Sequence, residues 1–288
     1  MRHEAAEVVG VIGAGVVGGS LAVWLRDQGH DVRIYDPPQG YEDARVLDDA
    51  AVVFVAVPTP YTPGVGFDDR HLLTAVATIS GEKAVVIKST VLPGTTDLLQ
   101  SRYPQHRFMF NPEFLREATA IEDFLQPDRQ IVGCASRASE ADAQCVLALL
   151  PVAPFERICA AAEAEMAKYV ANAFLAVKVS YANEMFDLCE RLRIDYAQVR
   201  DMVAADARIG ASHMDVLDGG YRGYGGKCLP KDSRSLLDLG RSVGIDLQVL
   251  GAADRVNALL RGVEATPAPL RIVRTHEAGD AEVKERAA

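Results

Sequence analysis

The sequence predicts an α/β protein in which a Rossmann-type, doubly wound parallel sheet is followed by an all-helical middle domain. Up to about residue 155, short apolar runs rich in β-branched residues alternate with helical patterns. These runs are continuously apolar, which is typical of parallel strands that helices cover on both faces. From about Ala160 the strand patterns stop, and only helical periodicity remains.

Six strands are expected, in the runs "EVVGVIG", "DVRIYD", "AAVVFVAVP", "KAVVIKST", "RFMFNP" and "RQIVGCA". The second part begins with one long helix over "AEAEMAKYVANAFLAVKVSYANEMFDLCERL", and further helices are expected at residues 196–204, 233–243 and 248–261. After Gly262 the chain becomes proline-bearing and charged, which is typical of a disordered terminus. The predicted segments are therefore a Rossmann domain over residues 1–155, a helical domain over 156–262 and a tail over 263–288.

The composition excludes several classes of protein. The chain has 288 residues, 49% hydrophobic and 24% charged, which is ordinary for a globular protein of about two domains. A net charge of -10 argues against a general nucleic-acid binder, because phosphate backbones are bound by a surplus of Lys and Arg. No run approaches the roughly 18 apolar residues of a membrane helix, and the N-terminus resembles a strand and turn more than a signal peptide. Five cysteines without a C-x-x-C pair indicate neither a disulfide framework nor a metal site, so we expect a cytoplasmic protein.

The first motif with a chemical meaning is a glycine-rich turn. Gly13, Gly15 and Gly18 form G-x-G-x-x-G between a predicted strand and a predicted helix, with Val17 inside the turn. In this context the glycines permit a tight turn, close approach of the backbone to a pyrophosphate, and close helix packing. Asp36 closes the second strand, where a carboxylate accepts hydrogen bonds from the adenosine ribose and favours NAD over its 2'-phosphorylated form. The alternative is a glycine turn that binds no dinucleotide.

Hydroxyl side chains follow two further predicted strands. Thr59 lies in "VAVPTP", and Ser89 and Thr90 lie in "IKSTVLPGTT". Both segments reach the carboxyl edge of the sheet, where ligands bind in open α/β folds. Ordinary turn chemistry explains each of them equally well when it is taken alone.

Two pairs of polar residues have helical spacing. Glu113 and Glu117 lie four residues apart, and they share one face if the segment is helical. Lys168 and Asn172 have the same spacing within the long predicted helix. A solvated helix face is the alternative explanation for both pairs.

The segment "GYGGKCLPKD" places Cys228 in a glycine turn, directly before Lys231 and Asp232. A cytoplasmic cysteine is most often a buried and inert thiol. A thiol in a flexible glycine turn, next to two lysines and a carboxylate, is an unusual combination that this alternative leaves unexplained.

Seven motifs together resemble the UDP-glucose/GDP-mannose dehydrogenase family over roughly residues 7–262. They are, in order, "GVIGAGVVG", "VPTP", "KSTVLPGTT", "NPEFLREATAIEDF", "AKYVANAF", "ARIG" and "GYGGKCLPKD". The resemblance implies NAD as cofactor, a nucleotide sugar or smaller phosphorylated alcohol as substrate, and a homodimer or larger homo-oligomer. From the charge and the lack of a long apolar run, we expect no nucleic-acid or membrane partner. Members of the family have a Rossmann domain, a helical middle domain that usually forms the dimer, and a third domain that binds the substrate's nucleotide.

The resemblance also implies a role for the thiol. Cys228 would be the nucleophile in a four-electron, two-NAD oxidation of a primary alcohol to a carboxylate. An aldehyde has no hydride to give until a nucleophile adds to it, and a thiolate provides a thiohemiacetal that is then oxidised to a thioester and hydrolysed.

By the same resemblance, the matching positions take three kinds of role. The implied catalytic residues are Cys228, Lys168, Asn172, Asp232, Glu113 and Thr90. The implied cofactor contacts are Gly13, Gly15, Val17, Gly18, Asp36, Thr59, Ser89, Glu117 and Lys231. The implied substrate contacts are Phe114, Leu115, Arg116, Arg208, Tyr224 and Gly225.

Several of these roles are specific. Lys168 and Lys231 would favour the thiolate of Cys228, and Lys168 with Asn172 would stabilise oxyanion character at the reacting carbon. Asp232, through a water shared with Thr90, would take part in proton removal.

The resemblance also implies roles for Glu113 and Arg208. Glu113 would be the general base of thioester hydrolysis. Arg208 would reach the substrate of a neighbouring subunit.

The sequence departs from the family in two places. It stops shortly after the start of the family's long connecting helix, so we expect the third domain to be absent or supplied by another chain, and the apolar face of helix 248–261 to be exposed. Ala118 stands where the family usually has glycine. These departures leave alternatives open: the same chemistry on a smaller phosphorylated sugar or nucleoside monophosphate, a two-electron dehydrogenase of the 6-phosphogluconate or β-hydroxyacid kind, or a non-catalytic NAD-binding subunit.

Overall fold

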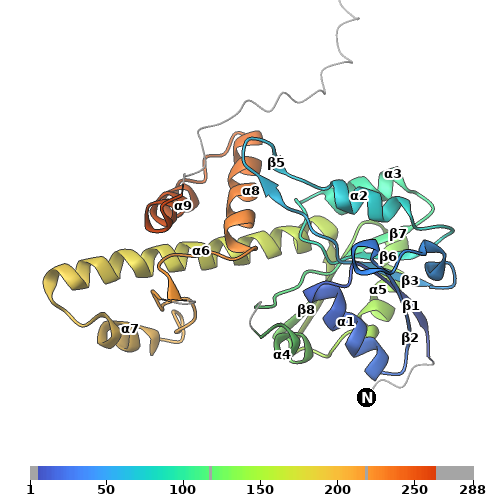
Figure 1. Ribbon diagram of the computed structural model, residues 1–288, viewed down its shortest axis with the longest axis horizontal. Coiled ribbons are helices and arrows are strands. Elements are labelled where there is room, and N and C mark those ends of the chain that lie inside the picture. The colour runs from blue at the N-terminus through green and yellow to red at the C-terminus, as the bar shows by residue number, and fades with distance from the viewer. Residues whose placement is uncertain (1–5, 117–118, 218–219, 264–288) are drawn as a thin grey trace, which may run out of the picture.

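The fold was obtained as a computed structural model that describes residues 6–116, 119–217 and 220–263 (Figure 1). A seven-stranded sheet has the order β2-β1-β3-β6-β7-β8-β9. Its strands are β1 Val8–Ile12, β2 Asp31–Tyr35, β3 Val52–Val55, β6 Ala84–Ile87, β7 Arg107–Phe110, β8 Arg129–Cys134 and β9 Phe155–Ala160. The six predicted strands are all present, and the sheet is mainly parallel as expected.

Two features of the sheet differ from the prediction. β8 pairs antiparallel with β7, and β9 then pairs in parallel with β8, so both run opposite to the first five strands. β9 itself was not predicted, because this edge strand is only half-buried and its sequence, FERICA, mixes polar with apolar residues. The predicted boundary at residue 155 therefore assigns most of β9 to the helical domain, although this strand belongs to the sheet.

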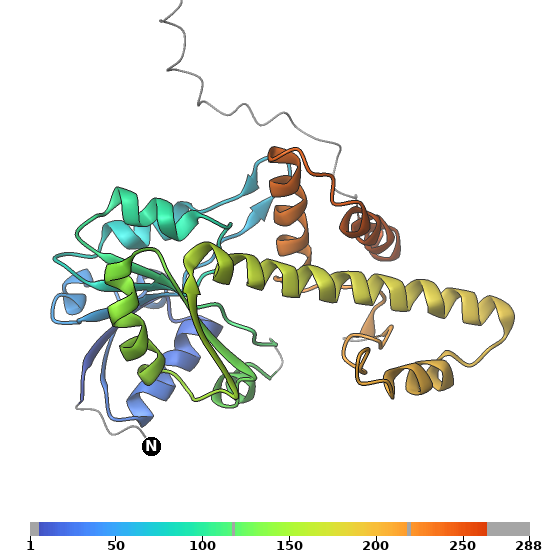
Figure 2. The ribbon, with the colours of Figure 1, turned by 180° about the vertical axis from the view of Figure 1, so that it is seen from behind.

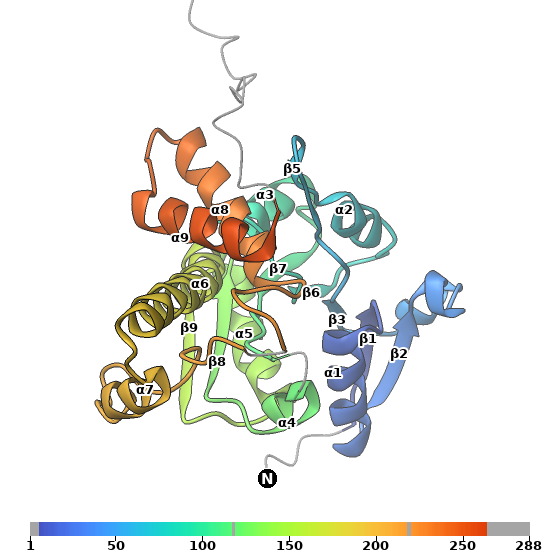
Figure 3. The ribbon, with the colours of Figure 1, turned by 60° about the vertical axis from the view of Figure 1, so that its left-hand side comes forward.

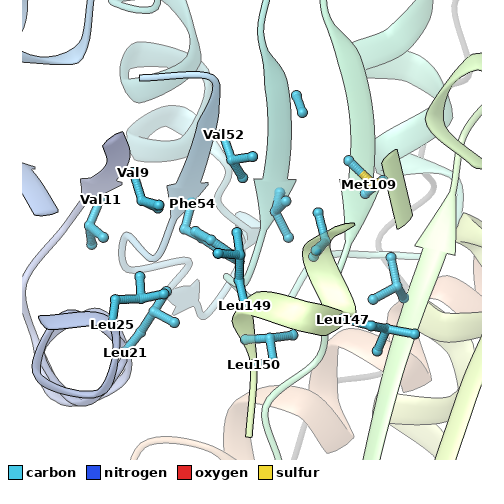
Figure 4. Close-up of a cluster of buried hydrophobic side chains, with 14 of the residues drawn as sticks. Val9, Val11, Leu21, Leu25, Val52, Phe54, Met109, Leu147, Leu149 and Leu150 are labelled. Carbon is cyan, nitrogen blue, oxygen red and sulfur yellow. The ribbon is translucent and has the colours of Figure 1, made fainter. Parts of the chain in front are cut away.

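Helices cover both faces of the sheet. On one face lie α1 (Val16–Asp27), α4 (Ala120–Leu125) and α5 (Arg137–Leu149). Leucines of α1 and α5 pack on the strand valines and Phe54 (Figure 4), and α4 adds Phe124 to the same cluster. On the other lie α2 (Arg70–Ala77), α3 (Thr95–Arg102) and the start of α6. Two short 3-10 helices, Pro37–Gln39 and Ala44–Leu47, follow β2. This double coverage explains why the strands are continuously apolar.

The second part is built on α6 (Ala161–Leu192), a helix about 48 Å long that leaves the sheet directly after β9 (Figure 2). α7 (Tyr196–Ala204) follows it, and α8 (Leu229–Ser242) and α9 (Gln248–Arg261) pack along it (Figure 3). α8 begins four residues earlier than predicted. No helix within the described ranges is both long and apolar enough to cross a membrane.

A small hairpin joins the two parts. Strands β4 (Tyr61–Thr62) and β5 (Gly66–Phe67) extend from the sheet toward α8 (Figure 1). The Tyr61 hydroxyl donates a hydrogen bond to Oδ2 of Asp238 on α8, at 2.8 Å. Burial, followed by this carboxylate, raises the pKa of Tyr61 to about 12. The hairpin thereby links the loop after β3 to the helix that begins next to Cys228.

A buried carboxylate fixes α6 to the sheet. Glu165 is fully buried, and its carboxylate accepts hydrogen bonds from the amides of Gly94 and Thr96 at 2.6 and 2.9 Å. The hydroxyl of Thr96 donates a third, at 2.5 Å. These donors lie at the N-terminus of α3, whose first amides have no partner within the helix. Glu165 therefore holds the loop after β6 against α6, one turn before Lys168.

We expect Glu165→Gln to lower the free energy of unfolding by about 1–3 kcal/mol, because an amide nitrogen cannot accept and leaves a buried donor unpaired. Chemical denaturation followed by circular dichroism measures this change. Glu184→Gln, at an exposed position of the same helix, is the matched control and should change stability by less than about 0.5 kcal/mol. Equal stability of the two variants would contradict the assignment.

Candidate active site

The glycine turn lies between β1 and α1 and is shaped to admit a ligand. Gly13 has φ +87°, and a Cβ there would lie 2.6 Å from the carbonyl oxygen of Ala56. A Cβ on Gly18 would lie 1.9 Å from the carbonyl oxygen of Gly13, so α1 could not pack as it does. At Gly15, the N-cap of α1, no atom lies within 4 Å of the corresponding position. The open space is at the helix N-terminus, where amides and the helix dipole bind phosphates, and Val17 follows it half-buried in the first turn.

Asp36 lies directly after β2, beside this turn. Its Oδ2 accepts the amide of Ala14 and the side-chain amide of Gln39, both at 2.7 Å. Oδ1 receives no hydrogen bond from any residue in the described ranges. A buried carboxylate with one oxygen left to accept suits a ribose hydroxyl, so these residues fit a dinucleotide such as NAD.

The hydroxyls after β3 and β6 bind the backbone. Thr59 Oγ1 donates to the carbonyl of Thr90 at 2.7 Å, and Ser89 Oγ donates to the carbonyl of Val57 at 2.7 Å. The two side chains thus tie neighbouring strand ends together at the edge where the site lies. The side chain of Thr90 is half-buried, and its shared water with Asp232 stays a prediction.

Glu113 lies in the non-helical loop 111–116 after β7, so the helical spacing with Glu117 does not apply. Its Oε1 is 2.8 Å from Lys168 Nζ, and its Oε2 accepts the amide of Leu115 at 2.8 Å. Burial alone would raise the pKa of Glu113, but Lys168, the Leu115 amide and Lys88 outweigh it and hold that pKa below its ordinary value. Glu117 and Ala118 lie outside the described residues.

A second charged cluster lies on α6 and α8. Asp232 is 1% exposed and accepts the side-chain amide of Asn172 at 2.6 Å and the ammonium of Lys231 at 2.5 Å. Lys168 and Asn172 lie one turn apart on α6, so one face of this helix carries a member of each cluster. The structure thus brings together four of the predicted catalytic residues, although one N–H of the Asn172 amide is already engaged by Asp232.

Cys228 is the N-cap of α8 and is exposed to solvent. Its pKa is raised: partial burial is the largest cause, Glu113 and Asp232 add to it, and Lys168 and Lys231 oppose it. Both lysines act in the predicted direction, toward the thiolate, but burial and the two carboxylates outweigh them, so the net effect is a raised pKa. Each lysine is paired with a carboxylate, whose negative charge offsets the effect of that lysine on the sulfur.

A pocket of about 440 Å³ lies beside the first cluster. Its lining includes three predicted substrate contacts, Phe114, Leu115 and Arg116, together with Lys88 and Glu113. The Phe114 ring lies between two cations, 3.7 Å from the Arg129 guanidinium and 5.4 Å from Lys168 Nζ. Arg116 is bound to Asp123 by a bidentate ion pair, which lowers the pKa of Asp123 to about 2.

The side chain of Tyr224 belongs to the core. Its ring is buried with Ala176 and Val179 of α6, and its amide donates to Asn257 of α9 at 2.7 Å. The contact of Tyr224 with the substrate stays a prediction, and a buried ring leaves the backbone of this residue as the group that could make it. At Gly225, by contrast, an added Cβ would lie 2.7 Å from the hydroxyl of Tyr221, so close packing excludes a side chain.

Arg208 is not part of the cluster around Cys228. Its side chain is 88% exposed and paired with Asp206. Lys178 of α6 donates to the carbonyls of Ile209 and Gly210, which places this turn about 15 Å along the helix from Lys168.

Lys88 is the residue that the sequence analysis missed. It is buried directly after β6, and its ammonium donates to Oδ1 of Asn111 at 2.5 Å. A lysine that ends an otherwise apolar strand, next to Ser89 and Thr90, was the available signal.

Comparisons with known proteins agree with this geometry. Residues 40–149 match the NAD binding domain of the UDP-glucose/GDP-mannose dehydrogenase family, and residues 162–259 match its central domain. UDP-glucose 6-dehydrogenase AglM of Haloferax volcanii is 32% identical, over 86% of this chain and 68% of that protein. A UDP-glucose 6-dehydrogenase of Pseudomonas aeruginosa is 34% identical, over 86% and 64%. That of Rickettsia conorii is 36% identical, over 73% and 50%.

Solved structures show the same likeness. A UDP-glucose dehydrogenase from Pyrobaculum islandicum has a TM-score of 0.80 at 30% identity, over 90% of this chain and 69% of that one. The 3-hydroxyisobutyrate dehydrogenase of Mycobacterium tuberculosis shares the fold alone, with a TM-score of 0.71 at 18% identity, over 91% and 96%. The chain spans between half and about two thirds of the curated relatives described above. It belongs to the UDP-glucose/GDP-mannose dehydrogenase family and carries that family's NAD-binding and central domains.

Proposed function

We propose that this protein is an NAD-dependent dehydrogenase that oxidises the primary alcohol of a nucleotide sugar such as UDP-glucose to a carboxylate, through a thioester on Cys228. One observation carries the proposal: an exposed thiol lies within the electrostatic reach of two lysine–carboxylate pairs, Lys168 with Glu113 and Lys231 with Asp232. A two-electron dehydrogenase needs no thiol at this place. The glycine turn and Asp36 would hold NAD, which when bound would supply the hydride acceptor for both oxidations.

The first task of the chain's own residues is proton removal from the alcohol. Asp232 receives this proton through a water that Thr90 helps to hold, and Asn172 and Lys231 fix the orientation of the carboxylate. Lys168 stabilises the negative charge that develops on the substrate oxygen. The product of this step is the aldehyde, with the alcohol's hydride removed.

The second task is to make the aldehyde oxidisable. The pKa of Cys228 is raised, so the resting thiol is protonated, and sulfur adds to the carbonyl carbon while its proton passes to the carbonyl oxygen. Loss of the second hydride and of the hydroxyl proton converts this thiohemiacetal to a thioester. Glu113, held ionised by Lys168, removes a proton from the water that cleaves the carbon–sulfur bond and restores the thiol.

Replacement of Cys228 tests the central step. Wild type should form two NADH per molecule of substrate, in a panel of UDP-glucose, GDP-mannose, hexose phosphates and nucleoside monophosphates. Cys228→Ser should lower acid formation by roughly a thousandfold or more, with alcohol oxidation retained in a single turnover. Cys145→Ser, at an exposed cysteine of α5, is the control and should behave as wild type. One NADH per substrate in wild type, with turnover unchanged in Cys228→Ser, would refute the thioester route and favour a two-electron dehydrogenase.

Replacement of Glu113 tests the hydrolytic step. We expect Glu113→Gln to accumulate the acyl-enzyme, because hydrolysis loses its base and slows by about 10²–10⁴-fold. Intact-protein mass spectrometry after a brief reaction would detect the acyl group on Cys228 as an added mass. Glu140→Gln, at an exposed glutamate of α5, should show no such adduct. Equal hydrolysis rates in both variants would remove Glu113 from this role.

The assembly we propose is a homodimer formed along α6. Six exposed apolar side chains lie on this helix at Met166, Val170, Phe174, Tyr181, Leu188 and Leu192. At 100° per residue they fall within about 80° of its circumference, so they form one continuous stripe. Phe174 is 66% exposed. A second copy of the chain would bury this stripe, and Arg208 would then be available to the partner.

Phe174→Asp should shift the protein toward monomer at micromolar concentration, because it places a charge in the middle of the proposed contact. Size-exclusion chromatography with light scattering measures the mass. Val65→Asp makes the same chemical change at an exposed position of the β4–β5 turn and should leave the mass unaltered. A wild type that is already monomeric would contradict the dimer and the role of Arg208 across it.

A further inference from the structure

Lys88 occupies the junction of three strands at the carboxyl edge of the sheet. It follows β6 and is 4% exposed, and its ammonium donates to Oδ1 of Asn111, the first residue after β7. The Asn111 side chain in turn donates to the carbonyl of Ile131 on β8, at 2.8 Å. Through one amide, Lys88 therefore fixes the point from which the loop carrying Glu113 departs.

Few polar groups face this ammonium. The charged groups near it are Glu113, from the loop after β7, and Lys168, from α6. From α4, the Phe124 ring lies 6.0 Å from Nζ. Within the described ranges, the Lys88 ammonium donates its hydrogen bond to the neutral amide of Asn111 and not to a carboxylate. Burial lowers the pKa of Lys88 to about 8, with Glu113 opposing and Lys168 adding to that shift.

Lys88, Lys168 and Glu113 together carry two positive charges and one negative charge. Lys168 is paired with Glu113, so Lys88 adds a second cation to one carboxylate. Because its pKa is about 8, Lys88 is protonated throughout the acid range in which a carboxylate titrates. Burial favours the protonated form of Glu113, which cannot act as a base, and Lys88 opposes this effect together with Lys168 and the Leu115 amide.

We propose that Lys88 is a positioning residue of the hydrolytic step: through Asn111 it holds the loop of Glu113, and by its charge it keeps the Glu113 carboxylate ionised. The inference rests on the proposed role of Glu113 as the general base. It extends that role, because the charge of Lys88 then acts on the protonation of the Glu113 carboxylate and not on the substrate.

The pH dependence separates this role from a merely structural one. The pKa of Glu113 is lowered in the folded protein, so the base is active above it and lost as pH falls through it. Removal of the Lys88 charge removes one cause of that lowering. The pH at which hydrolysis is lost on the acid side, called the acid limb, should therefore move to higher pH in Lys88→Met. Lys88→Arg keeps the charge and should leave the limb in place.

Lys83 provides a matched control. It begins the run into the same strand, is 9% exposed, and donates its ammonium to the carbonyl of Asp48 at the opposite edge of the sheet. Lys83→Met removes a comparably buried lysine without touching Glu113, so it should not shift the limb. Thermal melting of each variant confirms that it is folded.

The experiment has two readouts. The first is the rate of acyl-enzyme hydrolysis against pH in wild type, Lys88→Met, Lys88→Arg and Lys83→Met. The second is the titration of the Glu113 carboxyl by infrared difference spectroscopy in the cofactor-free protein, with Glu113→Gln in each background as the subtraction. A Glu113 pKa that rises in Lys88→Met, and in neither control, supports the proposal.

Three results are distinguishable. A uniform fall in rate with no shift of the limb, or an unchanged Glu113 titration in folded Lys88→Met, would overturn the role of Lys88. If wild type forms no acyl-enzyme, the proposed function fails, and the infrared titration still decides whether Lys88 sets the state of Glu113. An equal shift of the acid limb in Lys83→Met would mean that loss of any buried lysine has this effect, and it would also overturn the proposal.

Discussion

The contact between Glu165 and the N-terminus of α3 is the constraint on which the arrangement of the site depends. The cofactor turn and the strand ends belong to the sheet, whereas Lys168, Asn172, Cys228 and Asp232 belong to α6 and α8. These two sets of residues can work together only if α6 is fixed in rotation and in height against the sheet. A carboxylate that accepts three hydrogen bonds from one loop fixes both, because each donor has a direction.

Once α6 is fixed, the electrostatics of the site follow from pairing. Lys168 neutralises Glu113 and Lys231 neutralises Asp232, which leaves Cys228 surrounded by ion pairs and not by free cations. Burial then dominates, and the pKa of the thiol rises. A protonated resting thiol is protected from oxidation, since the thiolate is the reactive form. The cost is that sulfur must transfer its proton as it adds to the aldehyde.

The sequence predicted the features that depend on local pattern. The glycine turn, the continuously apolar strands and the one-turn spacing of Lys168 and Asn172 each follow from backbone geometry, and the structure has all three. It could not predict features set by contacts between distant segments. β9 is a half-exposed edge strand, and Tyr224 is buried only because α6 and α9 enclose it.

The state of the thiol shows the same limit more sharply. Proximity in sequence made Lys231 a candidate activator of Cys228, but the effect of a cation depends on what else it binds. Glu113 lies 115 residues before the thiol and 55 before Lys168, and yet it pairs with that lysine and offsets its effect on the sulfur. Lys88 was missed for the same reason. Its role depends on contacts with Asn111 and Glu113, and only the folded sheet brings these residues near it.

The two faces of α6 explain how one helix can serve both a site and a subunit contact. Relative to Met166 at 0°, the exposed apolar stripe covers about 0° to 80°, whereas Lys168, Asn172 and Glu165 fall at about 200° to 260°. The two faces are therefore nearly opposite. Burial of the stripe against a second copy would restrict the motion of α6 without covering the residues that we propose to act on the substrate. Because the polar face is already held by Glu165 at its first turn, such a contact would fix the distal part of the helix, which the sheet does not reach.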